Sequence, residues 1–183
     1  MHIDRLAIPD VIAFTPKRIG DARGYFSEVF RRDLIADHAP GVDFVQDNQS
    51  LSAEAGTIRG LHFQAPPHAQ AKLIRVLAGE IFDVAVDLRR ASPTYGQHVS
   101  LRLDATTGAQ LFIPAGFAHG FCTLEPATLI HYKVSTYYNA GADRGLAFDD
   151  PALAIKWPVA TGKALLSSKD KTHPKLADLV AVF

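Results

Sequence analysis

Two short stretches near the middle of the chain each place one histidine at a fixed distance after a turn glycine. The first, residues 56–64, reads GTIRGLHFQ and contains His62; the second, residues 108–119, reads GAQLFIPAGFAH and ends at His119. The first stretch also contains Arg59, and Lys72 follows a few residues later. An imidazole can accept a proton near neutral pH, and two cations can hold an anion. The combination indicates a site for an anionic substrate that loses a proton.

The same spacing raises the question of a metal. Small β-barrels of the cupin kind that bind metal place two histidines one residue apart, then a glutamate, and take a further histidine from the second stretch. Here Gln64 stands where the second histidine would be, and Pro67, His68 and Ala69 occupy the neighbourhood where the glutamate would follow. His62, His68 and His119 could in principle form a three-histidine set, but their spacing alone is poor support. The sequence therefore predicts no metal and leaves the histidines for proton chemistry.

Size and charge set broad limits. The 183 residues fit one domain, residues 1–183, and Lys+Arg and Asp+Glu both number 19, so there is no basic excess for nucleic acid. Cys122 is the single cysteine, which excludes an internal disulfide and fits a reducing compartment. No charged-then-apolar signal segment opens the chain, and no run of about 18 apolar residues could span a bilayer. We expect a cytoplasmic protein with no membrane partner.

Short β-rich runs separated by Pro and Gly must position these residues, and they predict an all-β domain. Residues 71–88 illustrate the pattern, with two alternating strands joined by a turn at Ala78 and Gly79. Helical periodicity is limited to a short helix over residues 32–38 and a segment over residues 175–180. The turn-rich residues 158–174 are expected to wrap around the barrel.

Nine segments, in one order along the chain, make the sequence similar to a known family. They are DARGYFSE (residues 21–28), QDNQS (46–50), TIRGLHFQ (57–64), QAKL (70–73), DLR (87–89), SPTYG (92–96), PAGFAHGF (114–121), DP (150–151) and SKD (168–170). Together they resemble the dTDP-4-dehydrorhamnose 3,5-epimerase family from about Ile8 to Pro174. The resemblance implies a double-stranded β-helix, that is, a jelly-roll, cupin-like barrel with a few short peripheral helices. It also implies a homodimer that exchanges its N-terminal segments, no metal and no cofactor.

The family's reaction gives the residues roles. Its substrate is a dTDP-4-keto-6-deoxy sugar, whose C4 carbonyl acidifies the hydrogens on C3 and C5. By resemblance His62 is the base, Asp170 orients and polarises its imidazole, Tyr132 is the proton donor, and Lys72 lies near the C4 oxygen, where an enolate develops negative charge. An isolated histidine would more often be a satisfied core residue, but Arg59 and Lys72 nearby favour catalysis for His62.

Strand alternation gives some of these roles independent support. Ile130, Tyr132 and Val134 share one face, so Tyr132 is expected to point inward among apolar neighbours, although a core tyrosine bonded to backbone is the ordinary alternative. Lys72 shares a face with Ile74 and Val76, which favours an inward position. Because the opposite face of that strand is also apolar in part, a solvated lysine at the strand edge stays open.

Further residues match positions that contact the substrate in the family. Arg23 and Arg59 match diphosphate ligands, Phe26 and Glu28 match thymidine contacts, and Gln46, Asn48, His119, Tyr138, Asp143 and Lys169 match other positions around the substrate. Asp143 stands where many members carry glutamate. Taken singly, each of these residues would more often have an ordinary surface or structural role.

Retention of the base, donor, enolate cation and orienting carboxylate favours epimerisation at both C3 and C5, in the synthesis of dTDP-L-rhamnose. Three alternatives stay open. An epimerase acting at one carbon can keep the same residues, a non-catalytic sugar-nucleotide-binding cupin would tolerate loss of His62, and a metal-dependent cupin enzyme would hold stoichiometric metal.

Overall fold

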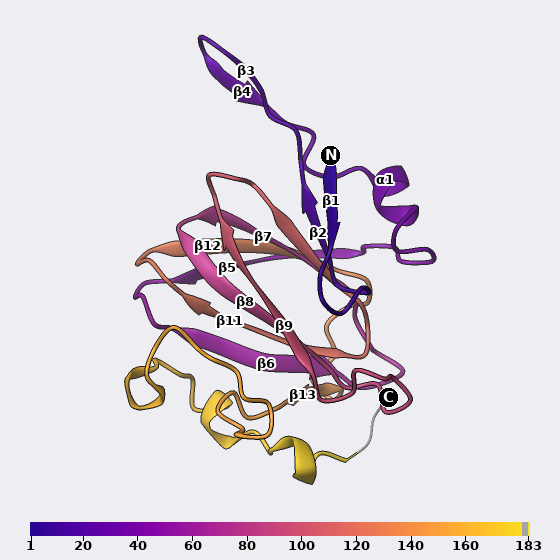
Figure 1. Ribbon diagram of the computed structural model, residues 1–183, viewed down its shortest axis with the longest axis vertical. Coiled ribbons are helices and arrows are strands. Elements are labelled where there is room, and N and C mark those ends of the chain that lie inside the picture. Colours follow the sequence, from indigo (N-terminus) through magenta and orange to yellow (C-terminus); the bar gives the residue numbers. More distant parts are fainter. Residues whose placement is uncertain (181–182) are drawn as a thin grey trace.

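Two β-sheets face each other and enclose the core of the protein. The computed structural model describes residues 1–180 and 183. The six-stranded sheet has the order β1 (His2–Arg5), β2 (Ile12–Thr15), β10 (Gln110–Ile113), β7 (Lys72–Ala78), β12 (Thr128–Val134) and β5 (Gln46–Ser52). The five-stranded sheet has the order β13 (Asp143–Gly145), β6 (Ile58–Gln64), β11 (Phe117–Thr123), β8 (Glu80–Asp87) and β9 (His98–Asp104). All pairings within both sheets are antiparallel, and Figure 1 shows the resulting jelly-roll barrel, which confirms the predicted fold class.

Alternation along the strands fills the space between the sheets. Ile74 and Val76 of β7 meet Ala85 of β8 and Ile130 of β12 in the central core. The residues of β8 that point the other way, such as Val84, lie in a second apolar cluster outside the five-stranded sheet. The predicted pair of strands in residues 71–88 is thus confirmed, and the turn between them is at Gly79, whose φ of 78° suits glycine.

The segment that follows β13 covers the outer face of the five-stranded sheet. Leu153, Trp157 and Leu176 pack against the apolar side of that sheet, and the Ile58 N–H donates to the Leu165 carbonyl at 2.9 Å. Residues 158–174 therefore wrap around the barrel as predicted. Three short 3-10 helices lie here: η1 (Thr161–Lys163), η2 (Asp170–Thr172) and η3 (Leu176–Asp178). The last falls inside the predicted segment 175–180.

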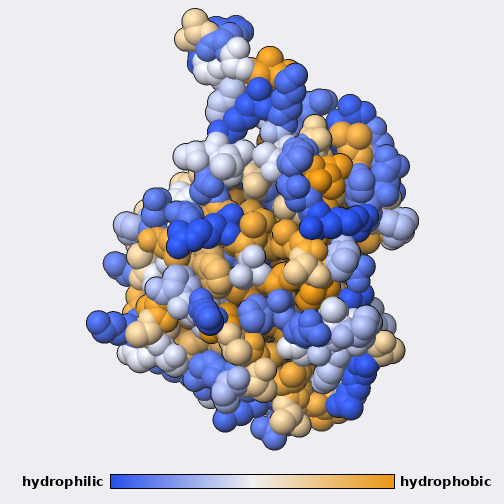
Figure 2. Space-filling model, viewed as in Figure 1, coloured by the Kyte–Doolittle hydropathy of each residue, from blue (hydrophilic) through white to orange (hydrophobic). Residues whose placement is uncertain are grey.

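The remaining elements belong to the N-terminal part of the chain. Helix α1 (Arg32–Ala36) lies where a short helix is predicted. No helix of the described residues is both long and apolar enough to cross a membrane. Strands β3 (Ile19–Asp21) and β4 (Gly24–Phe26) form a hairpin that projects from the barrel (Figure 1), and it stands clear of the body in the space-filling view (Figure 2).

Candidate active site

Two adjoining cavities lie between the sheets and share part of their lining. The inner cavity has a volume of about 260 Å³ and the outer one about 370 Å³. The inner cavity is lined by Ser50, Arg59, His62, Lys72, His119, Phe121, Ile130, Tyr132, Ser167, Lys169 and Asp170. The outer cavity shares His62, Lys72, Tyr132 and Lys169 with it and adds Gln46, Asn48, Phe63, Gln64, Gln70, Val134, Tyr138 and Asp143. Eleven of the fourteen predicted site residues thus line one connected space.

An irregularity in β6 explains how two of the predicted residues reach the same cavity. Arg59 and His62 are three positions apart, and a regular strand would place them on opposite faces. The register between β6 and β11 shifts, however, between the pair His119–His62 and the pair Phe121–Arg59. Gly60 sits within this shift with a φ of 122°, and a Cβ there would lie 2.6 Å from the Gly120 Cα. The bulge therefore requires glycine and turns both side chains inward.

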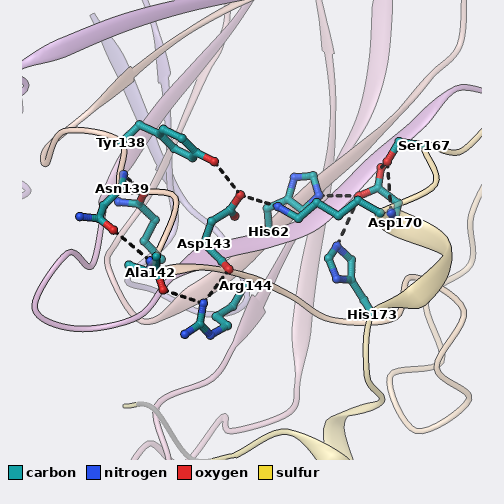
Figure 3. A network of polar contacts seen from close by, with 12 residues as sticks. His62, Tyr138, Asn139, Ala142, Asp143, Arg144, Ser167, Asp170 and His173 are labelled. Atoms are coloured by element: carbon teal, nitrogen blue, oxygen red, sulfur yellow. Dashed lines mark hydrogen bonds and ion pairs between the residues drawn. The ribbon is translucent and has the colours of Figure 1, made fainter.

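His62 and Asp170 form the central pair of the site. His62 Nε2 lies 2.5 Å from Asp170 Oδ1, and the Ser167 hydroxyl donates to Asp170 Oδ2 at 2.8 Å (Figure 3). Burial alone would raise the pKa of Asp170, but the hydrogen bonds from His62 and Ser167 outweigh it, and the pKa lies below its ordinary value. An ionised Asp170 fixes the tautomer of His62 with the proton on Nε2, which leaves Nδ1 as the ring nitrogen that can accept a proton.

Lys72 lies between the cavities, partly buried. Its Nζ donates to the His62 carbonyl at 3.2 Å. Burial lowers the pKa of Lys72 to about 8, and the charges of Asp143 and Asp83 oppose this shift only in part. The ammonium is therefore costly to keep and would be stabilised further by negative charge on a bound substrate. The strand-edge alternative for Lys72 is excluded by this position.

Tyr132 approaches the cavity from the sheet opposite His62. It lies on β12 with Ile130, while His131 and Lys133 point away from the cavity toward Asp47, as the alternation predicts. Burial raises the pKa of Tyr132, so the phenol keeps its proton at neutral pH and can donate it.

His119 closes the inner end of the cavity. It is 7% exposed, and its Nε2 lies 3.0 and 3.1 Å from the two carboxylate oxygens of the fully buried Asp83. Burial lowers the pKa of His119, against the opposing charge of Asp83. A neutral His119 that donates its Nε2 proton to Asp83 presents its remaining edge to the cavity as a fixed polar wall.

The outer cavity is bordered by a network around Asp143. The Tyr138 hydroxyl donates to Asp143 Oδ2 at 3.1 Å (Figure 3). Lys169 Nζ contacts the same oxygen. Beside them, the Tyr138 N–H donates to the Gln46 side-chain oxygen at 3.0 Å, and the Gln46 amide donates to the Asn48 side-chain oxygen at 2.8 Å. These groups offer donors, acceptors and an aromatic face at the mouth of the site, which suits a polar ligand that extends out of the inner cavity.

Three predicted residues lie elsewhere. Arg23 and Phe26 belong to the projecting hairpin, and Glu28 follows it; none lines either cavity of the same chain. Arg23 pairs with its neighbour Asp21 at 2.5 Å, and Phe26 is 65% exposed. Within one chain the structure does not bring these residues to the site.

The sequence reasoning missed Asp83, Ser167 and His173. Asp83 had a signal, since a carboxylate alternating with apolar residues in a strand is expected to need a buried partner. His62, Asp170 and His173 also form the one group in the described part of the chain that could hold a metal ion. The 2.5 Å separation of His62 and Asp170 suits a hydrogen bond, whereas two ligands of one tetrahedral zinc ion lie about 3.3 Å apart.

The facing sheets and the cavity define a cupin-like barrel whose interior carries a histidine–carboxylate pair, a lysine and a tyrosine suited to proton transfer. The family model described as dTDP-4-dehydrorhamnose 3,5-epimerase matches residues 5–178. The chain belongs to this family, as the sequence motifs predict.

Individual relatives agree with this assignment. A dTDP-4-dehydrorhamnose 3,5-epimerase of Sinorhizobium fredii is 52% identical over all of this chain and 93% of its own length. The structure of an epimerase from Legionella pneumophila in complex with dTDP-4-keto-L-rhamnose is 40% identical, with a TM-score of 0.92 over 98% of this chain and 96% of that one. ChmJ, a 3'-monoepimerase from Streptomyces bikiniensis, is 32% identical, with a TM-score of 0.87 over 97% of this chain and 88% of its own.

Proposed function

We propose that this protein is an isomerase that converts dTDP-4-dehydro-6-deoxy-D-glucose into dTDP-4-dehydro-L-rhamnose by inverting C3 and C5 without a cofactor. The observation that carries the proposal is the placement of a base and an acid on opposite walls of one cavity. His62 with Asp170 comes from the five-stranded sheet side, and Tyr132 comes from the six-stranded sheet.

Proton removal begins at His62. The C4 ketone acidifies the hydrogens on C3 and C5, so Nδ1 of His62 can accept one of them and leave an enolate. Asp170 stabilises the imidazolium that forms, because the ionised carboxylate already binds Nε2. Lys72 stabilises the charge on the C4 oxygen, and this interaction is stronger in the transition state than with the neutral ketone.

Inversion requires the new proton to arrive on the other face of the ring. The Tyr132 hydroxyl lines the same cavity from the opposite sheet and keeps its proton at neutral pH because burial raises its pKa. Donation by Tyr132 to the enolate carbon therefore gives the opposite configuration. His62 then releases its proton to solvent and Tyr132 regains one from solvent, so the same pair can invert the second carbon.

The nucleotide part of the substrate is held at the mouth of the site. Arg59 and Lys169 supply positive charge beside the inner cavity for the diphosphate, and Gln46, Asn48 and Tyr138 border the outer cavity. Asp143 holds Lys169 and Tyr138 in place through its carboxylate. His119 acts as a wall beside the sugar.

The active form is proposed to be a homodimer of single-domain chains in which each hairpin β3–β4 reaches the partner's site. Three predicted substrate ligands lie on or next to the hairpin and outside their own cavity. Ile19, Tyr25 and Phe26 are each at least 59% exposed, which is costly for large apolar side chains on an isolated arm. A second copy of the chain would cover them and add Arg23, Phe26 and Glu28 to the nucleotide end of the site. A cytoplasmic location stays a prediction.

The experiment that tests the reaction is proton NMR of dTDP-4-keto-6-deoxyglucose with the protein in heavy water. Loss of the signals at both C3 and C5, abolished in His62→Ala, is expected. Exchange at one carbon would instead indicate a single-centre epimerase. The similarity to ChmJ supports this alternative, but the identity to the 3,5-epimerases is higher, so double epimerisation is the preferred function. Absence of exchange would overturn the enzymatic function for this substrate and leave a sugar-nucleotide-binding protein.

A further inference from the structure

His173 lies behind the catalytic pair and has no role in the mechanism described above. Its side chain is 8% exposed, and Nε2 lies 3.4 Å from Asp170 Oδ1 without forming a well-aligned hydrogen bond to any described residue. The His173 ring also meets the His62 ring edge to face, with centroids 5.5 Å apart and planes at 82°. Figure 3 shows the His173 imidazole directed at the Asp170 carboxylate from below the His62–Asp170 contact.

The protein provides a shaped space for this ring. Gly145 of β13 is paired in register with His62 of β6, and a Cβ at Gly145 would lie 2.2 Å from Cε1 and Nε2 of His173. The next residue, Pro174, is held by a hydrogen bond from the Ala147 N–H to its carbonyl at 2.8 Å. The absence of a side chain beside the catalytic strand and the anchored backbone together place the imidazole against both members of the pair.

The protonation state of His173 determines what it can do there. Burial lowers the pKa of His173, and the positive charge of His62 lowers it further. A neutral ring can direct either an N–H or a lone pair at Asp170, and the carboxylate favours the tautomer with the proton on Nε2. The other titratable groups around the ring are Lys169, Lys171, Lys175 and Asp149.

A buried polar atom without a hydrogen-bond partner costs about 1–3 kcal/mol. An apolar ring of the same shape would fill this space without that cost. We propose that His173 is a positioning residue that directs its Nε2–H at Asp170. This contact fixes the orientation of the carboxylate and weakens its interaction with the Nε2 proton of His62. The proposal rests on the proposed epimerase function for its kinetic consequence, but the interaction with Asp170 exists in the free protein.

The test compares His173→Phe, which keeps the ring and loses the N–H, with His173→Gln, which keeps an N–H near the same place. The first readout is the downfield proton resonance of His62 Nε2–H in the free protein, which responds to the charge on its acceptor. The second is kcat for epimerisation across pH.

In His173→Phe we expect the resonance to move and kcat to fall about tenfold with little change in KM. The acidic limb of the kcat profile should move to higher pH, because Asp170 then interacts more strongly with the proton on His62. His173→Gln should restore each quantity to within about threefold of the wild type. The proposal is overturned if the Phe variant matches the wild type in resonance and pH profile. It is also overturned if both variants lose activity only in parallel with their melting temperatures. If the wild-type protein exchanges neither C3 nor C5, the epimerase function fails, and the resonance in the free protein still decides the role of His173.

Discussion

His62 Nε2 lies 2.5 Å from Asp170 Oδ1, although 108 residues separate the two in the chain. Only 3% of the Asp170 side chain is exposed, compared with 33% of the His62 side chain. Asp170 lies on helix η2, within residues 158–174, which wrap around the outside of the barrel, and His62 lies on strand β6. The pair therefore has a buried acceptor on one side and an open nitrogen on the other, which is the arrangement that a general base needs.

Replacing Asp170 by Asn tests this relationship. The amide is neutral, so it cannot stabilise the imidazolium and can orient His62 in the wrong tautomer; we expect kcat to fall by roughly 10³-fold with KM changed little. Steady-state kinetics on the dTDP-4-keto sugar would measure the loss. Ser167→Ala, which removes one donor to Asp170 but leaves its charge, serves as the control and should lose less than about tenfold. A kcat of Asp170→Asn within tenfold of the wild type would contradict the role of the pair.

The pKa of Lys72 predicts that activity is lost at high pH. Its pKa of about 8 means that the ammonium is present below that pH and is lost as the pH rises through it. Because the proposed mechanism uses this charge at the C4 oxygen, kcat/KM should decrease on the alkaline side with a midpoint near pH 8, and Lys72→Arg should move that limb upward. The measurement is a pH profile of kcat/KM at constant ionic strength. A flat profile up to pH 10 in the wild type would contradict this prediction.

The same burial predicts that Lys72 lowers the stability of the protein. A pKa depressed from 10.5 to about 8 corresponds to about 3 kcal/mol at pH 7. The penalty is complete below pH 8, because both folded and unfolded chains then carry the proton, and it disappears as the pH rises toward 10.5, where the unfolded chain also loses it. Lys72→Met should thus raise the melting temperature by several degrees at pH 7 and abolish epimerisation.

Calorimetry at pH 7 and pH 10 would test the sign, since the gain from Lys72→Met should shrink at the higher pH. Lys171→Met is a suitable control, because Lys171 is exposed and its removal should change stability little at either pH. Equal melting temperatures for wild type and Lys72→Met at pH 7 would show that burial of the Lys72 ammonium does not destabilise the folded protein.

Local patterns predict the parts of the site that lie on regular strands. Strand alternation is enough to place Tyr132 inside, and the face shared with Ile74 and Val76 places Lys72 correctly. Regular alternation fails for Arg59 and His62, because the bulge at Gly60 depends on the close approach of Gly120 from another strand.

Contacts between distant segments are harder to predict. Only the family motif predicts that Asp170 meets His62, since neither periodicity nor spacing links a 3-10 helix to a strand so far away in the chain. His173 has no sequence signal beyond its position three residues after Asp170, and its packing depends on the missing side chain at Gly145. Such residues become recognisable only when the tertiary contacts are known.

The hairpin β3–β4 predicts activity shared between chains. Mixing His62→Ala with the double variant Arg23→Ala, Phe26→Ala pairs a chain with an intact hairpin and a chain with an intact cavity. If the hairpin acts in the partner's site, each mixed dimer has one complete site out of its two. Because about half of the dimers in an equal, randomly exchanged mixture are mixed, about a quarter of the wild-type activity should return. If each hairpin served its own cavity, no mixed dimer would hold a complete site.

Neither parent variant alone should have more than a small residual activity, and the mixture must be allowed to exchange subunits before assay. Light scattering on the wild type checks the dimer itself. A monomer with full activity would contradict the exchange of hairpins, whatever the mixing experiment gives.

Tyr132→Phe separates proton removal from inversion. In the proposed mechanism His62 still takes the proton from the substrate in this variant. Because a third of its side chain is exposed, His62 can exchange that proton with solvent and return a deuteron to the same face. We therefore expect deuterium to enter the sugar at a rate within about tenfold of the wild type, while the rate of epimerisation falls by at least about a hundredfold. Proton NMR in heavy water follows both processes in one sample. Tyr138→Phe, which removes an exposed hydroxyl that contacts Asp143 at the outer cavity, should leave inversion nearly unchanged. If exchange and inversion were lost together in Tyr132→Phe, Tyr132 would have to assist proton removal as well, and the assignment of acid and base to opposite walls would be wrong.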